Sequence, residues 1–132
     1  DATADLTRPQ MTKAVMNGTD FCHMSGEDGT AVPFLAAGGV GCISVTANIA
    51  PRMCADMQRA WREGDVSACM ALQDRLMPVH AAMFCETSPG PVKYAAELLG
   101  KCSAEVRLPM TEISESSKQT VHEALVNAGL LN

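Results

Sequence analysis

Only two short runs in this sequence have the make-up of buried β-strands, and this scarcity constrains the possible folds more than any other feature. Residues 20–24 form an apolar run that ends at Ser25-Gly26, and residues 41–46 form a second run rich in β-branched side chains. Residues 30–37, between the two runs, have the pattern of a short helix that ends at Gly38-Gly39. A strand, a helix and a strand with tight glycine turns predict a βαβ unit, whose parallel strands are covered on both faces.

Helices are expected over most of the remaining sequence. A first-turn Pro9 and the stop signal Asn17-Gly18 predict a helix over residues 7–17. Beyond Pro51, we expect a helix over residues 52–63 and another that Asp65 caps, with a break or kink at Pro78 because proline lacks the donor that a helix interior needs. Further helices are predicted over residues 79–84, 92–99 and 114–126, the last with Ser114 as its N-cap.

Two parallel strands cannot form a stable sheet alone, because both edges of the pair stay open. The missing strands come either from other chains or from a larger α/β protein of which these residues are the C-terminal part. The abrupt start at Asp1, without an initiator methionine, favours the second interpretation.

Composition excludes several classes of function. The 132 residues carry 10 basic and 15 acidic side chains, a net charge of −5 without a basic patch, so we expect no nucleic-acid partner. No apolar run approaches the roughly 18–20 residues of a membrane helix, and no targeting segment is recognisable, so we expect no membrane partner and a cytoplasmic location. The six cysteines are scattered without a Cys-x-x-Cys pair, which predicts reduced packing residues, no metal site and no cofactor.

Several runs of the sequence resemble the dihydrodipicolinate synthase family. The run Gly-Gly-Val-Gly-Cys-Ile-Ser-Val-Thr-Ala-Asn at residues 38–48 is similar to the eighth barrel strand of these enzymes. The agreement extends to residues 1–6, 25–28, 75–80, 91–93 and 107–110, in the order of the family and over essentially the whole sequence.

The resemblance implies an α/β fold: the C-terminal part of a (β/α)8 TIM barrel, with strands 7 and 8 and their helices, followed by a small all-helical C-terminal domain. Residues 1–64 would belong to the barrel and residues 65–132 to the helical domain. The implied activity is that of a lyase in lysine (diaminopimelate) biosynthesis. A lysine forms a Schiff base with pyruvate, and the enamine adds to L-aspartate 4-semialdehyde to give 4-hydroxy-tetrahydrodipicolinate. The implied partners are the N-terminal half of the same polypeptide and further copies in a homotetramer.

The resemblance places the Schiff-base lysine immediately before Asp1, so we expect no catalytic residue in this chain and no activity from it alone. Its four lysines fall on predicted helices or a loop (Lys13, Lys93, Lys101 and Lys118), without the desolvated pocket that a lysine nucleophile needs. By resemblance, the backbone carbonyl of Ile43 contacts pyruvate and Gly26 allows a close approach to substrate. The alternatives are that Ile43 only fills the barrel and that Gly26 only makes a turn.

The resemblance also implies a contact between dimers through Leu6, Thr7, Ala36 and Ala37. The alternative for Leu6 is packing on its own helix as a hydrophobic staple. We expect His23 to be a core or inter-layer histidine with its hydrogen bonds satisfied, and the acidic pair Glu27-Asp28 to be solvated charge at a helix N-terminus.

Two other functions stay open on the sequence. One is another pyruvate-dependent lyase of the same superfamily, such as an N-acetylneuraminate lyase. The other is a truncated, non-catalytic oligomerisation module. The upstream reading frame separates the enzyme from the truncated module. Gly-Ile-Lys before Asp1 supports the enzyme, and a start codon near Asp1 supports the module.

Overall fold

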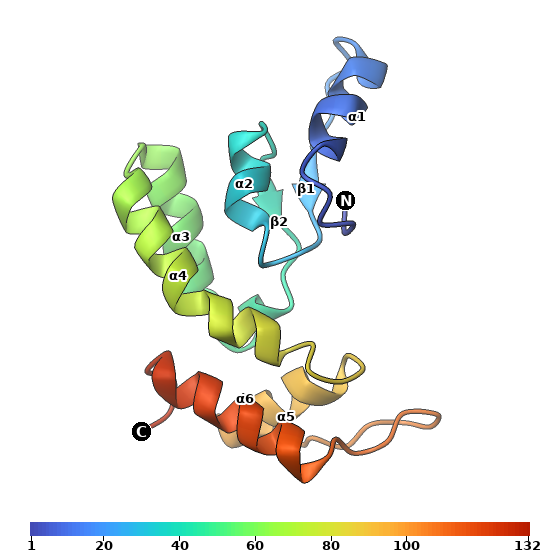
Figure 1. Cartoon of the computed structure of the whole chain (residues 1–132), viewed down its shortest axis with the longest axis vertical. Coiled ribbons are helices and arrows are strands. Elements are labelled where there is room, and N and C mark those ends of the chain that lie inside the picture. Colours follow the sequence, from blue (N-terminus) through green and yellow to red (C-terminus); the bar gives the residue numbers. More distant parts are fainter.

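Six α-helices, one 3₁₀ helix and one pair of short strands make up the computed structural model, which describes residues 1–132 (Figure 1). No helix has both the length and the apolar character needed to cross a membrane. In chain order the elements are α1 (Arg8–Met16), β1 (Met24–Ser25), α2 (Ala31–Ala36), β2 (Gly41–Cys42), η1 (Thr46–Asn48), α3 (Pro51–Glu63), α4 (Val66–Ala82), α5 (Gly90–Leu98) and α6 (Glu115–Asn127).

The two strands form the predicted parallel βαβ unit, but they are shorter than the sequence indicates. Met24 pairs with Gly41 and Ser25 with Cys42. The predicted strand over residues 20–24 is wrong for its first four residues, since β1 begins only at Met24. The predicted strand over residues 41–46 ends at Cys42, because the amides of residues 45 and 46 bond to a side chain instead of to a neighbouring strand. The prediction that both faces of the strands are covered is also wrong, because Ile43, within the predicted second strand, is 73% exposed.

Helix α1 follows its predicted bounds closely but buries little. Pro9 lies in the first turn, and Asn17 ends the helix in the left-handed region with φ of 32°. Pro9 is the only buried residue of α1, whereas Met11 and Val15 are 65% and 83% exposed. The apolar side chains of α1 therefore have no covering element within this chain.

Helix α4 passes through Pro78 without a break, so the predicted division at this residue is wrong. Asp65 caps the helix as predicted and accepts a hydrogen bond from the Ala68 amide at 2.9 Å. An interior proline costs about 3 kcal/mol of helix stability. Leu76 and Val79 flank Pro78 and are fully buried, and burial of each stabilises by roughly 2 kcal/mol, which offsets that cost.

The apolar core consists of two clusters that share α4. The first half of α4 packs with α2 and α3, and its buried members there are Cys69 and Leu76. The second half packs with α5 and α6 through Val79, Ala82 and Met83. Figure 1 shows α4 extending from α3 to the α5–α6 pair. This long helix therefore joins the βαβ region to the C-terminal helices.

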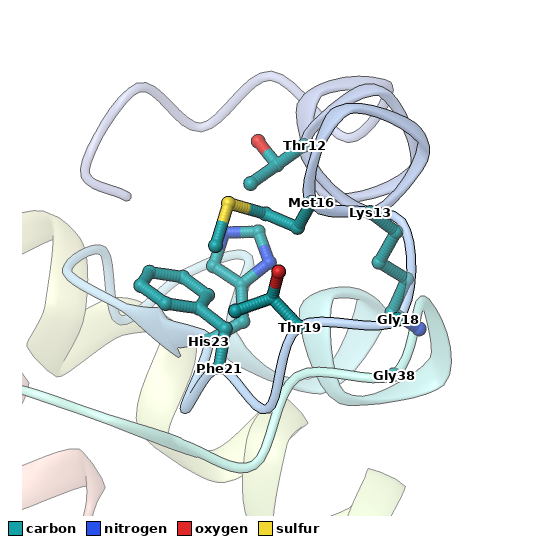
Figure 2. A pocket seen from close by; sticks show the side chains of 8 residues that line it. All are labelled: Thr12, Lys13, Met16, Gly18, Thr19, Phe21, His23 and Gly38. Carbon is teal, nitrogen blue, oxygen red and sulfur yellow. The ribbon is translucent and has the colours of Figure 1, made fainter.

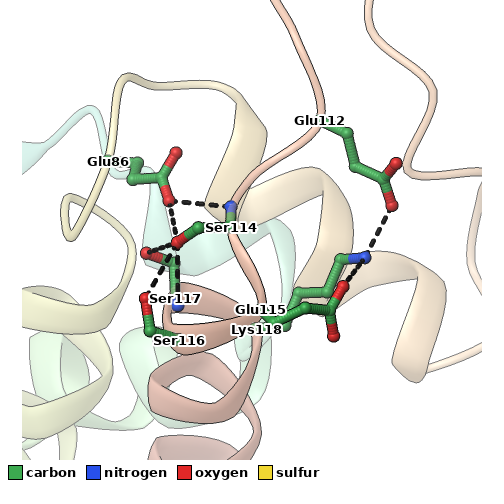
Figure 3. Close-up of polar contacts among 7 residues, drawn as sticks. All are labelled: Glu86, Glu112, Ser114, Glu115, Ser116, Ser117 and Lys118. Atoms are coloured by element: carbon green, nitrogen blue, oxygen red, sulfur yellow. Dashed lines mark hydrogen bonds and ion pairs between the residues drawn. The ribbon is translucent and has the colours of Figure 1, made fainter.

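Polar contacts hold the start of α6 against the loop that follows α4 (Figure 3). The Ser114 hydroxyl accepts a hydrogen bond from the Ser117 amide, which confirms the predicted N-cap. The Ser114 hydroxyl and amide both donate to the Glu86 carboxylate, at 2.6 and 2.9 Å. These bonds, that of the hydroxyl first, lower the pKa of Glu86 below its usual range. An anionic Glu86 is also favoured at a helix N-terminus.

Candidate functional site at the carboxyl ends of the strands

The carboxyl ends of β1 and β2 lie at one edge of the strand pair, because the strands are parallel. Gly26 directly follows β1, and Ile43 directly follows β2. The Ile43 amide donates to the Ser25 carbonyl at 2.7 Å, so the structure brings the two predicted binding residues together. Ligands of parallel α/β folds bind at this edge of the sheet.

Gly26 lies where the chain crosses its own N-terminal residues. Its amide donates to the Asp1 carbonyl at 2.7 Å, and a Cβ at this position would lie 2.9 Å from the Cβ of Ala2. A side chain would therefore displace the N-terminal segment. Glycine is required at position 26 because the chain passes close to the N-terminal segment, which itself lies at the strand ends.

The Asp28 side chain links the residues after β1 to those after β2 at this edge. It is 4% exposed, so the expectation of a solvated charge is wrong for this residue. Its carboxylate accepts hydrogen bonds from the Ser44 hydroxyl and from the amides of Val45 and Thr46, the latter two at 2.9 and 3.2 Å. These bonds replace the water that burial removes and attach the residues after β2 to the residues after β1.

Glu27 behaves as the helix-terminus charge that the sequence predicts. Its carboxylate accepts from the amides of Gly29 and Thr30, at 2.8 and 2.6 Å, and from the Thr30 hydroxyl. Burial acts to raise the pKa of Glu27, but the bonds from Thr30 and Gly29 outweigh it and hold the pKa below its usual range. Glu27 is therefore an anion at neutral pH and stabilises the start of α2.

A buried histidine extends the polar contacts from Asp28 to α4. The Thr46 hydroxyl lies 2.7 Å from Nδ1 of His80, and both side chains are buried. Burial lowers the pKa of His80, although the charges of Asp28 and Glu27 oppose it. Nε2 of His80 has no partner within the chain. Sequence reasoning missed the roles of Asp28 and His80, because no local pattern distinguishes a buried polar partner from a solvated one.

Neither the cysteine thiols nor the lysine amines of this chain are activated as nucleophiles at the strand ends. Burial raises the pKa of Cys42 and Cys54 to about 11, so both thiols stay protonated at neutral pH. Lys13 donates to the Ala37 carbonyl at 2.7 Å, Lys93 lies on α5 and Lys101 follows it. Lys118 pairs with Glu112 and Glu115 (Figure 3), and its hydrogen bonds to them, that to Glu112 first, raise its pKa.

The predicted interface residues lie at the start of α1 and at the end of the neighbouring α2. Leu6 is 46% exposed at the start of α1, and the Thr7 hydroxyl donates to the Asp5 carboxylate at 2.7 Å. Ala36 is exposed and Ala37 half-buried at the end of α2, where Lys13 reaches the Ala37 carbonyl.

A separate hollow of about 230 Å³ lies between α1 and the residues before β1 (Figure 2). His23 borders it, with an edge-to-face contact to Phe34 at 4.8 Å between ring centroids. His23 is buried, but its Nδ1 has no partner within the chain, so the expectation of a satisfied core histidine is wrong. Burial lowers the pKa of His23, and the positive charge of Lys13 lowers it further.

Comparisons with known proteins agree over nearly the whole chain. Residues 1–128 match the sequence model of the Dihydrodipicolinate synthetase family. The chain is 58% identical over 132 residues to the 4-hydroxy-tetrahydrodipicolinate synthase of Gluconacetobacter diazotrophicus, and 59% identical over 131 residues to that of Acidiphilium cryptum. It spans 44% of the length of each of these curated relatives, and 100% and 99% of the chain is matched.

Solved structures show the same similarity. The dihydrodipicolinate synthase of Thermotoga maritima matches with a TM-score of 0.94 and 32% identity, over 99% of this chain and 45% of that one. The chloride-inhibited dihydrodipicolinate synthase of Acinetobacter baumannii, complexed with pyruvate, matches with a TM-score of 0.91 and 34% identity, again over 99% of this chain and 45% of that one.

Proposed function

This chain belongs to the dihydrodipicolinate synthetase family, and from this membership we propose that it forms the C-terminal part of a lyase that condenses pyruvate with L-aspartate 4-semialdehyde. The product would be 4-hydroxy-tetrahydrodipicolinate, the compound after which the curated relatives are named. The observation that carries the proposal is the family match over residues 1–128, together with identities of 58% and 59% to synthases. No specific observation favours a different lyase.

We propose the following layout within that enzyme. The solved relatives are barrel enzymes, and this chain corresponds to their C-terminal part. In this layout β1 and β2 are the seventh and eighth barrel strands, residues 1–64 complete the barrel, and residues 65–132 form the helical domain. The boundary falls at Gly64, whose φ of 80° ends α3 before Asp65 caps α4. The uncovered side chains Val15 and Ile43 support this layout, since the remaining strands and helices of a barrel would lie beside them.

The proposed site uses backbone groups of this chain and a lysine from outside it. The Ile43 carbonyl accepts no hydrogen bond within the chain, so it is available to a ligand at the strand ends. In the proposed reaction a lysine amine attacks the pyruvate ketone, water leaves, and the resulting imine loses a methyl proton to give the enamine. The enamine carbon then attacks the aldehyde of the second substrate. In this proposal the Ile43 carbonyl contacts pyruvate, and the other residues described here hold the strand ends in position.

Assembly is proposed to be a cytoplasmic homotetramer, in which Leu6, Thr7, Ala36 and Ala37 contact a second dimer. The exposure of Leu6 and Ala36 supports this, since a large apolar side chain before α1 and a small one at the end of α2 suit close packing between copies.

Borohydride trapping of pyruvate tests the proposed function. The full-length polypeptide, incubated with pyruvate and borohydride, should gain one reduced pyruvate adduct per chain by intact-mass analysis, and peptide mapping should place it outside residues 1–132. The isolated 132 residues are the matched control and should gain none. An adduct on Lys13, Lys93, Lys101 or Lys118, or no adduct on the full-length polypeptide, would contradict the proposal.

A further inference from the structure

We propose that Asp28 is a positioning residue, which holds the peptide of Ile43 in the orientation that presents its carbonyl to bound pyruvate. This inference rests on the proposed function and assigns a role to a residue that does not itself touch substrate. The hollow beside His23 lies between α1 and the residues before β1, away from the strand ends.

Hydrogen bonds on either side of Ile43 fix the orientation of its peptide. On one side the Ile43 amide donates to the Ser25 carbonyl at 2.7 Å, which is the last contact between the strands. On the other side the next fixed groups are those of Ser44, Val45 and Thr46, all bound to Asp28.

The carboxylate of Asp28 makes all of these contacts to residues 44–46. Ser44 donates to one oxygen of Asp28, and the amides of Val45 and Thr46 donate to the other. Ser44 Oγ also accepts from the Ala47 amide at 2.8 Å, so the bond to Asp28 aligns a hydroxyl that fixes the next turn as well. Hydrogen bonds to an ionised acceptor are about twice as strong as neutral ones. The chain therefore leaves the strand direction at Ile43 because Asp28 captures residues 44–46.

Thr46, at the far end of this turn, is also held by a contact that does not involve Asp28. The Thr46 hydroxyl contacts His80 of α4, so residues 43–46 are held between the inter-strand bond and α4. Removal of the Asp28 contacts would leave both anchors in place, while residues 44 and 45 between them lose their partners. The expected result is a folded enzyme in which the Ile43 carbonyl has greater freedom.

Asp28→Asn separates this role from a general loss of charge. The amide keeps the shape of the carboxylate but replaces one acceptor oxygen with a donor, so either Ser44 or the two backbone amides lose their acceptor. Glu27→Gln is the matched control on the adjacent residue, because the Glu27 carboxylate contacts only Gly29 and Thr30.

The test uses the full-length enzyme, with steady-state kinetics in pyruvate and thermal unfolding of each variant. Asp28→Asn should raise the KM for pyruvate about tenfold relative to Glu27→Gln, with a smaller change in kcat, because a ground-state contact is weakened. Equal KM values for the two variants, with only a lower unfolding midpoint for Asp28→Asn, would overturn the inference.

Ser44→Ala decides the case if Asp28→Asn does not fold. This variant keeps the carboxylate and both backbone donors, and it should raise the KM for pyruvate about threefold at a nearly unchanged unfolding midpoint. An unchanged KM would overturn the inference. A wild-type enzyme that forms no pyruvate adduct would instead refute the proposed function, so the two failures are distinguishable.

Discussion

Leu76→Ala tests whether α4 is held in place by the cluster that it shares with α2 and α3. Leu76 is fully buried, on the side of α4 that faces the βαβ region, two residues before Pro78. Truncation of a fully buried leucine costs about 3 kcal/mol, through lost burial and the cavity left behind.

The unfolding midpoint of the full-length enzyme reports this cost. Relatives of this chain are about 300 residues long, since 132 residues cover 44% of them, so their unfolding entropy is about 0.6 kcal/mol per kelvin. A loss of about 3 kcal/mol then lowers the midpoint by about 5 °C. Circular dichroism at 222 nm, a wavelength that reports the helices, follows the transition.

Met77→Ala is the matched control at the next position of the same helix. Met77 is 41% exposed, so its truncation should lower the midpoint by less than about 2 °C. Equal midpoint shifts for the two variants, or a shift below about 1 °C for Leu76→Ala, would refute the explanation that burial of core side chains keeps α4 continuous at Pro78.

Two further predictions concern pH and assembly. The pKa of His80 is lowered by burial in the folded state, so its contribution to stability is full above about pH 6.5 and is lost as the pH falls, with a slope of at most about 1.4 kcal/mol per pH unit. Urea unfolding between pH 7.5 and pH 5.5 should therefore show a shallower decline for His80→Gln, and parallel declines would contradict the lowered pKa. Leu6→Arg should convert tetramers of the full-length enzyme to folded dimers in sedimentation velocity; an unchanged tetramer at micromolar concentration would remove Leu6 from the interface.

Local sequence signals predicted the helix termini of this chain well. Asp65 and Ser114 cap α4 and α6 as expected, and Gly64 ends α3 in the left-handed region. These predictions succeed because a cap involves atoms no more than about four residues apart, so the interaction is encoded in adjacent sequence. The parallel βαβ order was likewise predictable from glycine punctuation and β-branched composition.

The candidate site was predictable only in part. Gly26 and Ile43 could be placed at strand ends from the pattern and the family resemblance, and the structure brings those ends together. The lengths of the strands were not predictable, because a strand continues only where a neighbour offers its backbone groups. Here the Asp28 carboxylate takes the amides that a longer β2 would have given to a neighbour.

The contacts that hold the site depend on residues far apart in the chain. Asp28 and Ser44 are 16 positions apart, and Thr46 and His80 are 34 apart. The sequence around each of these residues resembles that of an ordinary helix start or helix face, so no local pattern distinguishes a buried polar partner from a solvated one. Folding decides the difference, because burial removes water from these groups and leaves the protein's own donors and acceptors as their only partners.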